Sequence, residues 1–132
     1  MLTSRAGQRF LLDTHALLWA LESPEELARA ARVAVASPRS AVFVSAASVW
    51  EISIKGALKK LRVPPDLIHA IETVGFSELP ITAFHAERAG NLPLHHTDPF
   101  DRMLVAQAQA EGLILVTRDA NIPRYGIRTL TA

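Results

Sequence analysis

The most constraining feature of the sequence is a helical pattern followed directly by a strand pattern, which runs from Asp98 to Asp119 and reads DPFDRMLVAQAQAEGLILVTRD. Asp98 before Pro99 is a common helix start, because the carboxylate accepts the first backbone N–H groups and proline lacks an N–H that would go unused. Gly112 ends the predicted helix. The apolar run 113–116 that follows is typical of a strand covered on both faces, as in a parallel sheet. The stretch therefore predicts one helix and one buried strand with a carboxylate at each end.

The remaining chain alternates between short strand patterns and helical patterns. Strands are predicted at 10–12, 41–44, 79–81 and 127–130. Helices are predicted at 16–21, 24–36, 46–61, 66–74 and 83–89, and Ser23 with Glu26 predicts a capping box before the second of them. Strands separated by helices indicate βαβ units, so the sequence predicts an α/β fold with a central parallel sheet and helices on both faces.

The composition fits one globular domain. The chain has 132 residues, of which 49% are apolar, and we expect a single domain over 10–132 behind a flexible leader at 1–9. Its lack of cysteine excludes a disulfide framework. No apolar run is long enough for a bilayer and no secretory leader is recognisable, so we expect a cytoplasmic protein without a membrane partner. The net charge of +1 is too small to attract nucleic acid as a whole, so any nucleic-acid site must depend on local charge.

Four acidic residues stand where ligand sites form in parallel α/β sheets. Asp13 and Asp119 each follow a predicted strand, and Glu51 and Asp101 each fall in the first turns of a predicted helix. Because ligands bind beyond the carboxyl ends of the strands, we expect all four carboxylates to reach the same edge of the sheet. Asp101 also shares its helix face with apolar residues, which is a costly place for a charge without a partner.

Four converging carboxylates repel one another, and a divalent cation that prefers oxygen ligands, Mg²⁺ or Mn²⁺, relieves that repulsion. Such a site suits phosphodiesters, because bound metal can activate water for in-line attack and stabilise the leaving oxygen. Lys55, Lys59 and Arg62 are predicted to share one arc of the Glu51 helix. There they would guide a polyphosphate backbone toward the acids, which would otherwise repel it.

Other interpretations of the same residues stay open. Asp98 fits a helix cap alone, and Glu51 with Lys55 has the spacing of a surface ion pair. The basic arc fits an ordinary solvated helix face. The adjacent histidines His95 and His96 suggest zinc, although two neighbouring side chains do not readily face one ion and the chain has no cysteine.

Four segments carry a family resemblance: FLLDTHALLW, VSAASVWEISIKGALKKL, DPFDRMLVAQA and LILVTRD. In this order and spacing, over about Phe10 to Leu130, they resemble the PIN-domain family and especially the VapC-type toxins of bacterial toxin–antitoxin pairs. The resemblance implies a three-layer α/β/α sandwich on a central parallel sheet and a Mg²⁺- or Mn²⁺-dependent endoribonuclease activity. It also implies homodimerisation and neutralisation by a small antitoxin protein.

The resemblance transfers site roles motif by motif. It assigns catalysis and metal binding to the acids Asp13, Glu51, Asp101 and Asp119, with Asp98 as a further candidate metal ligand. It implies that three polar residues support these acids or face the substrate: Thr14, Ser45 and Thr117. We therefore hypothesise a type II toxin that cleaves RNA phosphodiesters by in-line attack of metal-activated water. In this hypothesis Asp13 and Asp101 hold the principal ion, and Glu51 and Asp119 complete the cluster.

Two rival functions belong to other classes. A phosphorelay receiver also gathers acids and Mg²⁺ at strand ends, but this chain has Ser45 and Thr117 where the phospho-accepting aspartate and the lysine would stand. A non-catalytic PIN-like module that binds RNA or a partner protein would share the fold and lack cleavage. An assay of cleavage with Mn²⁺ and with EDTA separates this module from the enzyme.

Overall fold

The chain is organised around a five-stranded sheet in which all neighbouring strands run parallel. The computed structural model describes residues 7–132, and its strands are β1 Arg9–Leu12, β2 Ala41–Ser45, β3 Ser77–Leu79, β4 Ile114–Thr117 and β5 Thr129–Thr131. Their order is β3-β2-β1-β4-β5. The central strand is β1, in which Phe10 pairs with Val42 of β2 on one side and with Ile114 of β4 on the other. The predicted α/β fold with a parallel sheet is confirmed.

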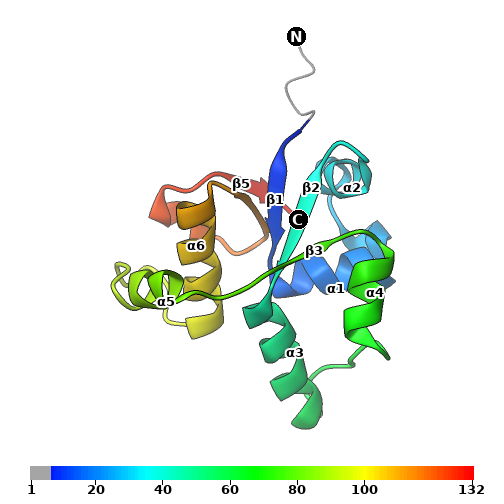
Figure 1. Ribbon diagram of the computed structural model, residues 1–132, viewed down its shortest axis with the longest axis horizontal. Coiled ribbons are helices and arrows are strands. Elements are labelled where there is room, and N and C mark those ends of the chain that lie inside the picture. Colours follow the sequence, from blue (N-terminus) through cyan, green and yellow to red (C-terminus); the bar gives the residue numbers. More distant parts are fainter. Residues whose placement is uncertain (1–6) are drawn as a thin grey trace.

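Helices cover both faces of this sheet and give three layers. The α-helices are α1 Thr14–Glu22, α2 Arg29–Ala36, α3 Ala46–Ala57, α4 Leu67–Thr73, α5 Ala83–Gly90 and α6 Pro99–Glu111, with short 3₁₀ helices η1 Pro24–Glu26 and η2 Ile122–Tyr125. Helices α5 and α6 lie on one side of the sheet, and α1, α2 and α4 lie on the other (Figure 1). Among residues 7–132, no helix combines the length and the apolarity needed to cross a bilayer.

Each face of the sheet has its own buried cluster, which explains why the central strands are wholly apolar. Phe10 and Leu12 of β1 pack with Leu17 of α1 in one cluster. Leu11, which points to the opposite face, packs with Leu104 of α6 in the other. Successive side chains of a strand alternate between faces, so a strand covered on both sides needs an unbroken apolar run.

The stretch from Asp98 to Asp119 forms one helix and one buried strand, as predicted. The Asp98 carboxylate accepts the backbone N–H groups of Phe100 and Asp101, at 2.8 and 3.0 Å, and so caps α6. Gly112 ends the helix in a left-handed conformation with φ of +67°, which glycine adopts at little cost.

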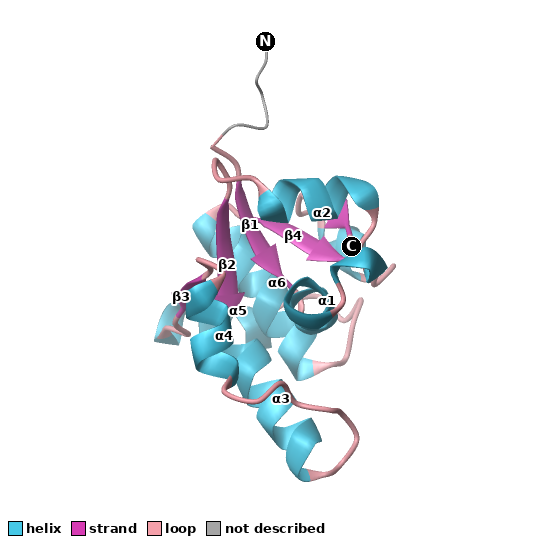
Figure 2. Ribbon diagram, turned by 90° about the vertical axis from the view of Figure 1, so that its right-hand side faces the viewer, coloured by secondary structure: helices cyan, strands magenta, loops and turns pink. Residues whose placement is uncertain are grey.

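The arrowheads of β1 and β2 point toward the end of the molecule from which α3 extends (Figure 2). Asp13 and Asp119 follow their strands at this end.

Helix α3 is shorter than the predicted range of 46–61, because the chain closes it with a Schellman cap. The helix stops at Ala57. The Lys60 N–H donates to the Lys55 carbonyl and the Lys59 N–H donates to the Gly56 carbonyl, while Lys59 takes a left-handed φ of +55°. This pair of hydrogen bonds around a left-handed residue defines the motif.

The end of α3 overturns one prediction about charge. Lys59 and Arg62 come after the last helical residue, so they do not share a helical arc with Lys55. The predicted basic arc on the Glu51 helix is therefore wrong.

Three boundaries also differ from those predicted. The Ser23 side chain makes no capping hydrogen bond, because 24–26 forms a 3₁₀ turn and α2 begins only at Arg29, so the predicted capping box is wrong. Strand β3 ends before Pro80, which has no N–H to donate to a neighbouring strand. Strand β1 begins at Arg9, one residue inside the predicted leader, and residues 1–6 of that leader lie outside the described part.

Candidate active site

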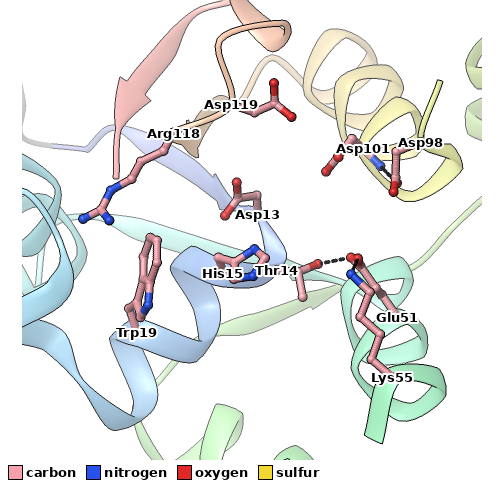
Figure 3. Close-up of a pocket in the computed structure, with 10 residues that line it drawn as sticks. All are labelled: Asp13, Thr14, His15, Trp19, Glu51, Lys55, Asp98, Asp101, Arg118 and Asp119. Carbon is pink, nitrogen blue, oxygen red and sulfur yellow. Dashed lines mark hydrogen bonds and ion pairs between the residues drawn. The ribbon is translucent and has the colours of Figure 1, made fainter. Parts of the chain in front are cut away.

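A cavity of about 220 Å³ opens at the carboxyl ends of the central strands (Figure 3). Its wall brings together the four predicted acids from four separate places in the chain: after β1, on α3, on α6 and after β4. The lining residues are Asp13, Thr14, His15, Trp19, Glu51, Lys55, Asp98, Asp101, Arg118 and Asp119. The expectation that all four carboxylates reach one edge of the sheet is thus met in space, and Asp98 joins them.

Asp13 is fixed between strand β1 and helix α1. Its backbone N–H donates to the Val116 carbonyl at 3.1 Å, which continues the pairing of β1 with β4. Its Oδ1 accepts the Ala16 N–H at 2.8 Å and caps α1. The side chain is buried, and this burial raises the pKa of Asp13, while hydrogen bonds from the Thr117 hydroxyl and the Ala16 N–H act in the opposite direction. A carboxylate in this position favours a cation beside it.

Asp101 lies in the first turn of α6, on the side that faces the core. Burial, followed by the charge of Asp98, raises the pKa of Asp101 to about 7, although His96 acts in the opposite direction. Glu51 and Asp13 add to the increase. Near neutral pH this carboxyl group is therefore partly protonated and partly charged. A cation bound beside it would favour the charged form.

Glu51 differs from the other acids because its two oxygens already have partners. It is only 6% exposed. The Thr14 hydroxyl donates to Oε1 at 2.5 Å, and the Lys55 ammonium donates to Oε2 at 2.6 Å. The hydrogen bond with Glu51 also raises the pKa of Lys55. The predicted ion pair is present, but it anchors a buried carboxylate in the cavity wall and is no surface pair.

Asp119 is held by backbone and side-chain donors after β4. Its Oδ1 accepts the Asn121 N–H at 2.8 Å, and its own N–H donates to the Thr117 hydroxyl at 3.0 Å. Its Oδ2 lies 2.6 Å from Nε2 of His96. The buried Thr117 supports two acids. Its hydroxyl oxygen accepts the Asp119 N–H, and its hydroxyl proton is donated to the Asp13 carboxylate.

The sequence did not single out His96 as part of this cluster. As expected for adjacent histidines, the two side chains do not face one ion. Only His96 of the pair turns to the acids, while the His95 ring packs against Tyr125 at 4.9 Å between centroids. The signal in the sequence that could have found His96 is its position two residues before Asp98, the N-cap of α6. There the Asp98 N–H reaches back to Nδ1 of His96 at 3.1 Å.

Three cavity-lining residues were also missed, and four predicted residues do not line the cavity. His15, Trp19 and Arg118 form the wall opposite α3, where the Arg118 guanidinium stacks 4.1 Å from the Trp19 ring centroid. Within residues 7–132, the cavity lining does not include Lys59 or Arg62, nor the buried residues Ser45 and Thr117. Ser45 is fully buried and instead caps α3 by accepting the Ala47 N–H at 2.9 Å.

Comparisons with known proteins identify a family with this architecture. The family model described as PIN domain matches residues 10–127. No match was found among curated proteins.

Solved structures with a similar fold include three from bacteria. VapBC2 from Rickettsia felis, bound to a DNA fragment from its promoter, gives a TM-score of 0.68 at 14% identity and covers 93% of this chain and 98% of that chain. DNA-bound VapBC from Salmonella typhimurium gives 0.67 at 23% identity, with coverage of 93% and 97%. A toxin–antitoxin complex from Klebsiella pneumoniae gives 0.60 at 21% identity, with coverage of 92% and 96%. At these identities the likeness shows a shared fold.

Proposed function

Because the chain belongs to the PIN-domain family, we propose that it is a Mg²⁺- or Mn²⁺-dependent endoribonuclease and the toxin of a type II toxin–antitoxin pair. It cleaves RNA in the cytoplasm and leaves a 5′-phosphate and a 3′-hydroxyl. One observation carries the proposal: Asp13, Glu51, Asp101 and Asp119 converge on a single cavity at the carboxyl ends of the strands. Ligand sites of parallel α/β sheets occur at this edge.

The residues present fit a hard divalent cation. Asp13 and Asp101 both have a raised pKa, and neither forms an ion pair with a lysine or arginine among residues 7–132. Converging carboxylate oxygens are the donors that Mg²⁺ and Mn²⁺ prefer. Asp13 and Asp101 would hold the ion, with Glu51 and Asp119 completing the set. When bound, the ion supplies Lewis acidity to water and to the phosphodiester.

The chain's own side chains prepare the cavity for an anionic substrate. Thr14 and Lys55 hold the Glu51 carboxylate in one orientation before substrate arrives. The Lys55 side chain is still 38% exposed, so its ammonium can meet phosphate charge at the wall. Arg118 supplies a second cation on the opposite wall. Local cations on the two walls thus replace the basic arc that the sequence predicted.

The protein partner in this proposal is a small antitoxin. The similar structure from Klebsiella pneumoniae is a toxin–antitoxin complex, which supports this assignment. Trp50 and Leu94 are 62% and 81% exposed, so apolar surface is available for a partner. Co-expression with the product of the gene immediately upstream should give co-purification and loss of RNA cleavage. The proposed homodimer should have twice the chain mass of 14.4 kDa by light scattering.

A cleavage assay on the purified chain tests the enzymatic function. End-labelled single-stranded RNAs of varied sequence are incubated with Mg²⁺, with Mn²⁺ and with EDTA, beside DNA of matched sequence. We expect cleavage of RNA with either metal, none in EDTA and recovery when Mn²⁺ is restored in excess. If RNA binds but is never cut with metal present, the chain is the non-catalytic binding module instead.

A further inference from the structure

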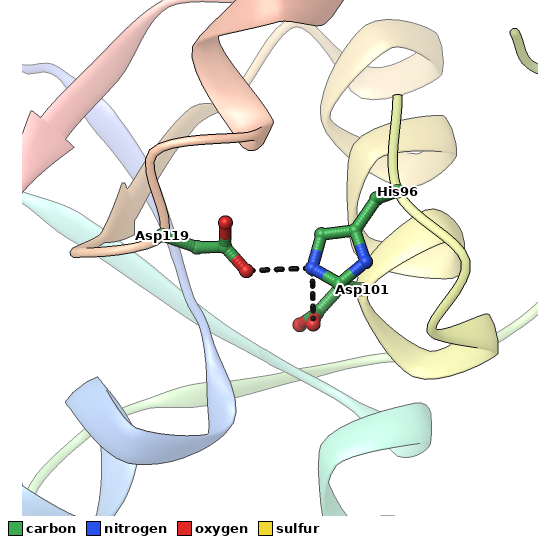
Figure 4. Close-up of side chains that lie close together, drawn as sticks. All are labelled: His96, Asp101 and Asp119. Atoms are coloured by element: carbon green, nitrogen blue, oxygen red, sulfur yellow. Dashed lines mark hydrogen bonds and ion pairs between the residues drawn. The ribbon is translucent and has the colours of Figure 1, made fainter. Parts of the chain in front are cut away.

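His96 reaches the edge of the acidic cluster, and its contacts fix where its ring carries a proton. Nδ1 accepts the Asp98 backbone N–H at 3.1 Å. A nitrogen that accepts a hydrogen bond has no proton of its own, so the neutral ring carries its proton on Nε2. Nε2 lies 2.6 Å from Oδ2 of Asp119 and 3.1 Å from Oδ2 of Asp101 (Figure 4). The ring therefore acts as a donor toward the carboxylates.

This protonation state conflicts with a role as a metal ligand. One ligand atom from each of His96, Asp101 and Asp119 lies within 4.8 Å of the other two, a spacing that suits a shared cation. A ligating nitrogen must offer its lone pair, and the other ring nitrogen then carries the proton and donates it to an acceptor. Here the other nitrogen faces the Asp98 N–H, which is itself a donor. The spacing fits a ligand, but the hydrogen bonds fit only a donor.

We propose that His96 is a positioning residue, which holds the Asp119 carboxylate beside Asp101 by donating its Nε2 proton and is not a ligand of the cation. The inference rests on the proposed function. Both oxygens of Asp119 are then fixed, because Oδ1 accepts the Asn121 N–H. Such support of a ligating carboxylate orients it for a metal without contact between the supporting group and the ion.

The loop that carries His96 is clamped from two sides, so the ring is placed by the fold. The His96 N–H donates to the Tyr125 hydroxyl at 2.9 Å, and that hydroxyl donates to the Pro93 carbonyl at 2.8 Å. The Arg102 guanidinium of α6 donates to carbonyls at the end of α5 and in the loop that follows it: Ala89, Gly90, Leu92, Pro93 and His96. The position of a side chain held in this way is defined more precisely than that of a side chain on an unrestrained loop.

Metal selectivity separates a positioning residue from a ligand. Calorimetry gives the affinities of untagged protein for Mg²⁺, Mn²⁺ and Ni²⁺ in the wild type, His96→Ala and His96→Gln. We expect His96→Ala to lose about tenfold in affinity for each ion alike, because it acts through the carboxylates. The amide N–H of His96→Gln should restore most of that loss. His95→Ala is the matched control and should leave all three affinities unchanged.

A ligand would behave differently, because imidazole binds Ni²⁺ far better than Mg²⁺. A loss that is much larger for Ni²⁺ than for Mg²⁺ would overturn the proposal. A uniform gain, or no change in any affinity, would also overturn it, since neither fits a group that orients a ligating carboxylate.

Nitrogen NMR gives a readout that does not depend on activity. In protein labelled with ¹⁵N at histidine, the His96 signal, assigned by its loss in His96→Gln, should show a proton on Nε2 both without metal and with saturating Mg²⁺. Loss of that proton on adding Mg²⁺ would make His96 a ligand. If the wild type binds no divalent ion, the proposed metal dependence fails, whereas an unprotonated Nε2 in the metal-free protein would refute the donor role itself.

Discussion

Asp101 couples the charge of the cavity to the stability of the fold. Its pKa is about 7 in the folded protein, chiefly because of burial, and its ordinary value is 3.8. Between these values the folded state holds the proton more tightly than the unfolded state does. The stabilisation from the protonated carboxyl is therefore complete below about pH 4 and is lost as the pH rises through about 7.

Replacing Asp101 should flatten this dependence. In EDTA at pH 8 we expect Asp101→Asn to be more stable than the wild type by on the order of 1 kcal/mol, because a charge that is disfavoured by burial and by Asp98 is gone. The difference should shrink toward pH 5, where the folded wild type keeps its proton. Urea unfolding at the two pH values measures it. An equal difference at both would show that Asp101 does not carry a raised pKa.

Lys55 should be needed to keep the Glu51 carboxylate buried without metal. In EDTA, Lys55→Met should lower the free energy of unfolding by about 1 kcal/mol, a figure reduced because the ammonium is partly exposed. Added Mn²⁺ should recover part of the loss, since a cation can replace the missing charge. Lys59→Met, outside the cavity, is the control. Equal stability of both variants in EDTA would mean that the 2.6 Å pair contributes nothing.

The four acids and the polar partners Thr14, Lys55 and Thr117 were predictable from sequence, whereas His96 and Arg118 were not. Asp13 and Asp119 follow short apolar runs of the kind that is typical of a buried parallel strand, so the sequence pattern predicted their place at the sheet edge. The orientation of the His96 ring depends on its hydrogen bond from the Asp98 N–H. The position of the Arg118 guanidinium depends on its stacking on Trp19, which lies on α1. Such contacts arise from tertiary packing and leave no periodic signal in the sequence.

At the scale of the helix, ends with a local chemical signature were predictable and others were not. Asp98 with Pro99 and Gly112 marked both ends of α6, because cap chemistry is confined to a few neighbouring residues. The end of α3 had no such mark, since Lys59 occupies the left-handed position that glycine usually takes. The helical pattern continued past it, and the basic arc predicted from that pattern was wrong.

Arg102 of helix α6 should hold the loop 91–97 in its conformation. Arg102→Lys retains the charge but not the planar fork that reaches several carbonyls, so we expect it to lower the free energy of unfolding by about 2 kcal/mol. Amide exchange should become faster at 91–97 and stay unchanged in β1 and β2. The readout is exchange followed by mass spectrometry. Arg128→Lys, on a separate segment, is the control, and unaltered exchange in the loop would remove Arg102 from its role as a clamp.

At the scale of the whole molecule, the alternation of strands and helices predicted the layers but not the strand order. The order β3-β2-β1-β4-β5 places β1 between the two strands whose ends carry Ser45 and Thr117. A phosphorelay receiver has the order 2-1-3-4-5, so the topology excludes that rival. Because β1 is central, Asp13 lies between α3 and α6, and acids far apart in the sequence meet across it.

The proposed site of cleavage is tested most directly by the rate of RNA cleavage with Mn²⁺ in two variants, Asp101→Asn and Asp66→Asn. Both variants remove one carboxylate charge, but Asp66 is exposed, lies outside the cavity and has a left-handed conformation that asparagine accepts. We expect at least a hundredfold loss for Asp101→Asn, on the order of 3 kcal/mol in transition-state stabilisation, and a wild-type rate for Asp66→Asn. A wild-type rate for Asp101→Asn would contradict the proposal, because the four carboxylates would then not form the site of cleavage.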